Sequence, residues 1–133
     1  MKRMRVLLAG LLGVSLVVLA LATVPASATA TSAKITIGNT ALLLPDGSAV
    51  MTVTYTCAPA PANNTVGQVE GFLGQGPING IAIETATCDN RSHSVNLHVV
   101  PGPFSQGSAS AFAIVVNFDS SSFASTSRGV MVK

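Results

Sequence analysis

The chain has 133 residues, of which 48% are hydrophobic, only 9% are charged and none is tryptophan. So few charged residues argue against long solvated helices and against a charged disordered tail. From residue 31 onward, four basic and five acidic residues leave a net charge of −1, so no basic stripe remains for nucleic acid or an anionic membrane. The length corresponds to one domain at most.

The first thirty residues have the pattern of an export signal. Three basic residues among the first five precede a largely apolar run over 6–22, and two overlapping A-x-A sites follow a proline. This order is typical of a secretory signal peptide rather than of a membrane anchor. We therefore expect a signal peptide helix over 1–30, cleavage that leaves Thr29 or Thr31 at the N-terminus, and a secreted domain over 31–133 without membrane attachment.

The expected secreted domain contains two cysteines, Cys57 and Cys88. Exported proteins meet an oxidising environment, so we expect these residues to form a disulfide. A metal or redox pair would need a C-x-x-C motif or histidines at ligand spacing, and the sequence has neither. Closing a loop of about 30 residues contributes roughly 3–4 kcal/mol on the chain-entropy model, which is a large share of the net stability of a small domain.

Alternation of apolar and polar residues with a period of two dominates the rest of the chain. It predicts strands over 34–38, 49–57, 66–73, 81–88, 93–100, 108–118 and 129–133. Clusters of Gly, Pro, Asn, Asp and Ser separate these segments, and no helical stripe of apolar residues extends beyond one turn. Seven short strands in about a hundred residues predict an all-β fold, an immunoglobulin-like antiparallel β-sandwich.

The same alternation predicts which side chains are buried. The expected core consists of Met51, Val53, Tyr55, Val95, Leu97, Val99, Ile114 and Val116. Thr52 and Thr54 should be exposed. The segment 108–118 is apolar on both faces, and the predicted core places its larger residues inward and its alanines outward.

Alternating strand directions also predict where the loops gather. The second and fourth strands run in the same direction and end at Cys57 and Cys88, so a bridge between them lies at one pole of the sandwich. The loops expected at this pole are 58–64, 89–92 and 119–127. The loops expected at the other pole are 45–48, 74–80 and 101–107.

Two segments resemble those of a family of small secreted actinobacterial β-sandwich proteins. Residues 46–57 match a D-G-x-x-x-x-x-x-x-Y-x-C strand opening, and residues 104–111 match F-x-x-G-x-A-x-A. The resemblance covers essentially the whole chain from residue 31. Members often have further cysteines in the last third, which this chain lacks. The family has no characterised function, so the resemblance implies an immunoglobulin-like fold and secretion but no activity.

The sequence offers little for catalysis or metal binding. His93 and His98 lie five residues apart on one expected strand, so they face opposite sides and cannot share a metal ion by themselves. His93 is close to Asp89, as in a fragment of a catalytic triad, but no G-x-S-x-G motif accompanies it. Glu70 and Glu84 could approach as a glycosidase pair, yet the chain has no tryptophan platform for a sugar. We therefore expect no enzyme activity, no cofactor and no metal.

The remaining candidate for binding is the pole with the loops 74–80 and 101–107, where Ile78 and Phe104 make the loops unusually apolar. We expect a non-enzymatic module that binds an unknown protein or cell-surface partner. A carrier of a small apolar ligand, held in a cleft between these two loops, is the alternative. A third interpretation gives these side chains no binding role, since they could plug the end of the sandwich.

Overall fold

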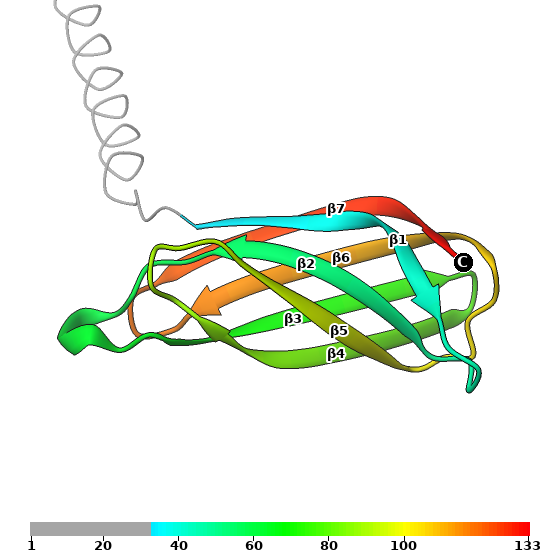
Figure 1. The fold of residues 1–133 in the computed structure, drawn as a ribbon, viewed down its shortest axis with the longest axis horizontal. Coiled ribbons are helices and arrows are strands. Elements are labelled where there is room, and N and C mark those ends of the chain that lie inside the picture. The colour runs from blue at the N-terminus through cyan, green and yellow to red at the C-terminus, as the bar shows by residue number, and fades with distance from the viewer. Residues whose placement is uncertain (1–32) are drawn as a thin grey trace, which may run out of the picture. The chain divides into compact units, whose positions relative to one another are not determined.

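The computed structural model describes residues 33–133, so the expected signal peptide over 1–30 lies outside the described residues. The strands are β1 (Lys34–Leu43), β2 (Ala49–Thr56), β3 (Val66–Gln75), β4 (Ile78–Thr87), β5 (His93–Pro101), β6 (Gly107–Asn117) and β7 (Ser122–Val132). One turn of 3-10 helix, η2 (Pro61–Asn63), lies between β2 and β3 (Figure 1). Among the described residues, no helix has the length and apolar character needed to cross a membrane.

The seven strands close into a barrel in the order β1-β2-β5-β4-β3-β6-β7. Long antiparallel ladders connect β1, β2 and β5 into one layer and β4, β3, β6 and β7 into another. Two seams of two residue pairs each join the layers, Gly80↔Pro101 with Ile81↔Val100, and the parallel Thr40↔Met131 with Ala41↔Val132. The all-β, seven-strand prediction is confirmed. The two separate sheets of the predicted sandwich are instead closed, because these seams pair strands that would otherwise be edges.

Strand bounds differ from the prediction in the middle of the chain and at both ends. The loop predicted over 74–80 is only a turn at 76–77, because β3 runs to Gln75 and β4 begins at Ile78. β1 continues to Leu43, past a register shift between Ile37 and Ala41 that interrupts the alternation visible in the sequence. β7 begins at Ser122, so most of the loop predicted over 119–127 is strand. The serines and the threonine of β7 are typical of loops, but the backbone of β7 pairs with β6 along the whole strand.

The interior confirms most of the predicted core. Met51, Val53, Tyr55, Leu97 and Val99 are buried, whereas Val95, predicted to be buried, is only half-buried beside the core. Thr52 is exposed as predicted, and Thr54 is half-buried.

The faces of β6 are reversed relative to the prediction. The inward side chains are Ala109, Ala111, Ala113 and Val115, while Ile114 and Val116 are half-buried on the outside. The reason is space, since the neighbouring position in β3 is Gly71, where an added Cβ would lie 2.6 Å from Leu97 Cδ1 and 3.1 Å from Met51 Sδ. Met51 and Leu97 from the β1–β2–β5 layer fill the interior opposite Gly71, so the wall beside that position is built from small side chains.

The disulfide prediction is confirmed. Cys57 and Cys88 are bonded, with their Cα atoms 4.6 Å apart. The Asn90 N–H donates to the Cys57 carbonyl at 2.9 Å, which places the loop after β4 beside the end of β2. We call this the disulfide end. At the other end, the Phe104 N–H donates to the Gly47 carbonyl at 2.7 Å, and we call it the Phe104 end.

Candidate binding surface

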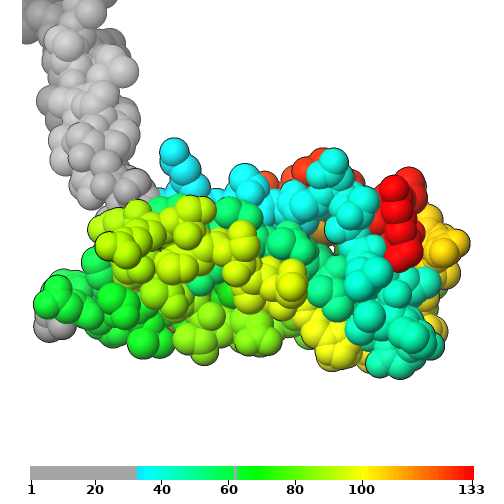
Figure 2. Space-filling view, in the orientation of Figure 1, coloured from blue at the N-terminus to red at the C-terminus, as the bar shows by residue number. Residues whose placement is uncertain are grey.

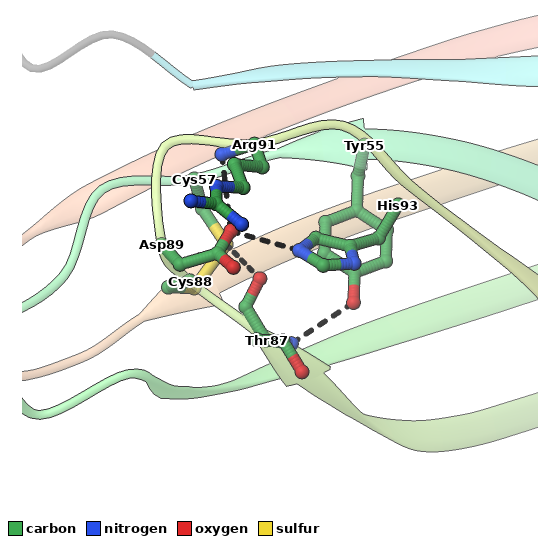
Figure 3. Close-up of polar contacts among 7 residues, drawn as sticks. All are labelled: Tyr55, Cys57, Thr87, Cys88, Asp89, Arg91 and His93. Atoms are coloured by element: carbon green, nitrogen blue, oxygen red, sulfur yellow. Dashed lines mark hydrogen bonds and ion pairs between the residues drawn. A yellow bond between two sulfur atoms is a disulfide. The ribbon is translucent and has the colours of Figure 1, made fainter.

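A histidine and a carboxylate lie beside the disulfide. His93 Nε2, at the start of β5, is 2.8 Å from Asp89 Oδ1, and the His93 ring packs against the Tyr55 ring with centroids 5.8 Å apart (Figure 3). The Arg91 N–H donates to the same oxygen at 3.0 Å. The hydrogen bond from His93 lowers the pKa of Asp89 below its usual value.

The contacts of this cluster order the loop over 88–92 and connect the strand ends on either side of it. The Thr87 N–H donates to the hydroxyl of the buried Tyr55 at 2.9 Å, next to the disulfide (Figure 3). Within residues 33–133, no three His, Cys, Asp or Glu side chains gather where they could hold a metal ion. The His93–Asp89 pair therefore exists as the sequence suggested, but its visible role is to position this loop.

A second histidine cluster, which the sequence did not reveal, lies at the Phe104 end. Ser48 Oγ donates to Asp46 Oδ1 at 2.5 Å and lies 2.7 Å from His98 Nε2. Because the hydroxyl has one proton, Nε2 of His98 must be the donor to Ser48. His98 therefore cannot act as the base that activates this serine, and Ser48 is itself buried.

The cluster instead fixes the turn between β1 and β2 to β5. Both the hydroxyl and the N–H of Ser48 donate to Asp46, and these bonds lower the pKa of Asp46. His98 is exposed, as expected, and it reaches Ser48 because β5 pairs with β2 in a register that places it opposite Val50. This proximity depends on strand register, which spacing along the chain does not specify.

The side chains expected to form a binding pole face the interior. Phe104 is only 5% exposed and belongs to the hydrophobic core, and Ile78 is half-buried against that core. The turn after β5 directs the Phe104 ring inward, where it closes the end of the barrel. Of the interpretations that the sequence left open, the geometry gives Phe104 the role of a plug.

Large exposed apolar side chains gather elsewhere, on the outer face of the β4–β3–β6–β7 layer. Its exposed members are Val66, Ile81, Ile83, Phe112, Phe123 and Met131. Ile81, the half-buried Phe72 and Phe112 are direct neighbours across three strands. The rings of Phe72 and Phe112 are 5.7 Å apart and tilted by 49°. We call this surface the apolar face.

A groove of about 350 Å³ lies on the apolar face beside this aromatic row. The residues that line it include Phe72, Gly74, Asn79, Ser110, Phe112 and Ser127. Gly74 is paired with Asn79 on one side and Ser110 on the other, so a row of small residues runs next to the row of rings. None of the described residues that line the groove is charged.

The outer face of the β1–β2–β5 layer, which we call the polar face, is polar along most of the ladder between β2 and β5, with exposed Leu42 and Val100 only toward the Phe104 end. Thr52 Oγ1 donates to Asn96 Oδ1 at 2.9 Å, and the hydroxyls of Thr54 and Ser94 are 2.9 Å apart. Figure 2 shows this side of the molecule, with β5 and β2 in front. Its polar groups satisfy one another across the ladder between β2 and β5.

Comparison with models of protein families and with curated proteins found no match for this chain.

Proposed function

We propose that this protein is a secreted, non-enzymatic binding module that contacts its partner through the apolar face. The observation that carries the proposal is the row of Ile81, Phe72 and Phe112, which continues into exposed Ile83 on the next outward position of β4. Phe123 lies two rows further along the same face, opposite Val116, and Glu70 occupies the intervening row of β3. Contiguous exposed apolar side chains on a small protein mark interaction sites. The disulfide and the expected signal peptide both support an extracellular location.

We also propose that the barrel is a variant of the immunoglobulin-like sandwich expected from the resemblance to secreted actinobacterial proteins. In support, the long ladders group the strands as β1-β2-β5 and β4-β3-β6-β7, and each seam between the groups is only two residue pairs long. Two layers joined by such short seams are close to a sandwich whose edges have met.

The proposed partner is a protein or another cell-surface component with a complementary apolar patch. Four strands at about 4.8 Å spacing and ten residues at about 3.3 Å rise give the face roughly 600 Å². Standard stable interfaces use about 800 Å² from each partner. Contact through this face alone therefore favours a weak, reversible complex rather than a permanent one.

The experiment compares binding of fluorescently labelled protein, purified after export, to the surface of the cells that secrete it. Ile83→Ser and Phe123→Ser remove exposed apolar side chains outside the groove, and Thr52→Ala is the matched control on the polar face. We expect cell-surface binding that both apolar-face variants weaken at least about tenfold, which corresponds to 1.4 kcal/mol, and that the control leaves unchanged. Absence of saturable binding, or equal binding by all four proteins, would contradict a cell-surface partner.

The second candidate function is that of a carrier for a small apolar ligand. The groove beside Phe72 and Phe112 favours it, because its volume of about 350 Å³ lies within the range of small-molecule sites. Its location differs from the expected cleft between the loops 74–80 and 101–107, since the groove opens on the outer surface of the sheet. The carrier function thus uses the same apolar face.

A further inference from the structure

We propose that the groove beside Phe72 and Phe112 binds a small, neutral molecule with an aromatic ring. This inference rests on the proposed function in one respect, namely that the apolar face is the binding surface. It goes further by assigning a ligand class and a set of residues to one part of that face.

The chemistry of the lining selects a neutral ligand. The two phenyl rings form an apolar wall, and their tilted arrangement leaves ring faces and edges available to a third aromatic group. The described lining residues offer no charge to compensate an ionic group that leaves water. Asn79, Ser110 and Ser127 can supply hydrogen bonds, so the ligand is expected to have an apolar body with one or two polar atoms.

The size of the face also favours a small occupant. A second copy of the chain, packed face to face, would bury roughly 600 Å² on each side, which is less than the roughly 800 Å² per partner of a standard interface. The groove itself is near the lower end of the volumes seen for small-molecule sites. A compact ligand of two or three rings can fill this groove.

Gly74 keeps the groove open. A Cβ atom at this position would lie 3.2 Å from Asn79 Oδ1 and 4.0 Å from the Ser110 carbonyl oxygen, and it would contact no core residue within 4 Å. A glycine inside a strand weakens the strand, and such glycines often mark a close approach by a ligand. A larger side chain at position 74 would therefore fill the groove from outside without disturbing the interior.

The experiment uses two probes that differ in one group. N-phenyl-1-naphthylamine is neutral and aromatic, and 1-anilinonaphthalene-8-sulfonate has the same ring system with an added negative charge. We expect saturable binding of the neutral probe at one site per chain, detected by its fluorescence, and at least about tenfold weaker binding of the anionic probe because no cation compensates the sulfonate. Equal affinities for the two probes, or no saturable binding of the neutral one, would overturn the proposal.

Three variants locate the site. Gly74→Val fills the groove and Phe112→Ser removes one wall, so each should weaken binding of the neutral probe at least about tenfold. Thr52→Ala, on the polar face, is the control and should leave the affinity unchanged. Thermal unfolding of each variant verifies that the protein remains folded. If Phe112→Ser does not fold, Gly74→Val decides alone, and retention of wild-type affinity by a folded Gly74→Val protein would refute the site.

The outcome separates this inference from the proposed function. If the neutral probe does not bind in the groove but Ile83→Ser and Phe123→Ser abolish binding to cells, the ligand class is wrong and the binding face stands. If the variants and the wild-type protein have the same affinity for the probe and the same binding to cells, both proposals fail.

Discussion

The polar and apolar faces of this barrel show two ways in which the outer face of a sheet can meet solvent. On the polar face, hydroxyl and amide groups such as those of Thr52 and Asn96 bond to one another across the strands. On the apolar face, Phe112 and Ile83 remain 39% and 55% exposed. A face whose groups are already paired gains little from a partner, whereas exposed rings gain free energy when another surface covers them. This contrast is the physical basis for placing binding on one side of the molecule.

The largest expected effect distinguishes the interior from the apolar face. Leu97 is fully buried, so Leu97→Ala should lower the free energy of unfolding by roughly 2–5 kcal/mol. Ile83→Ala, on the apolar face, should change it by no more than about 0.5 kcal/mol. Urea denaturation measures both. Similar losses for the two variants would show that the apolar face is packed as tightly as the core.

A smaller effect tests which face of β6 points inward. Ala113 is fully buried next to Gly71, so Ala113→Leu should overpack the interior and cost about 1–3 kcal/mol. Ile114→Leu is the matched control on the adjacent outer position, and its cost should stay below about 0.5 kcal/mol. Chemical denaturation of both variants settles the orientation. A reversed ranking would restore the orientation predicted from the sequence alone.

The smallest effect on stability is expected only at acidic pH. It concerns two carboxyl groups that are hydrogen-bonded near the two ends of β5. The pKa values of Asp46 and Asp89 are lowered in the folded protein by bonds from Ser48 and His93, respectively. A lowered carboxyl pKa adds stability above the unfolded value near 3.8, and this stability is lost as the pH falls through the folded value. Asp46→Asn should therefore flatten the decline of the unfolding temperature below about pH 4. An unchanged decline would mean that this carboxyl does not contribute.

The comparison of faces also explains what the sequence could predict. In β2 and β5, threonine, serine and asparagine alternate with valine, leucine and methionine, so the polarity of each position identifies its side. In β6 the residues on both faces are largely apolar. Only the volume available opposite Gly71 decides that the alanines point inward. Volume is a property of the assembled barrel, which no single strand encodes.

The candidate site could not be predicted from the sequence, for a related reason. Phe72 and Phe112 are 40 positions apart and meet only because β3 pairs with β6 in one register. Likewise, Ser48 meets His98 through the pairing of β2 with β5. By contrast, the disulfide was predictable because the chain has two cysteines and no choice of partner.

The position of the disulfide sets when this barrel can close. The seam between β4 and β5 has its ladder only at Gly80 and Ile81, toward the Phe104 end. At the opposite end, the Cys57–Cys88 bond fastens β4 to β2, the strand on the far side of β5. A reduced chain therefore keeps a weak closure at one end and loses the covalent one at the other. Covalent closure at the disulfide end therefore needs oxidising conditions, and reduction should leave the barrel easier to unfold.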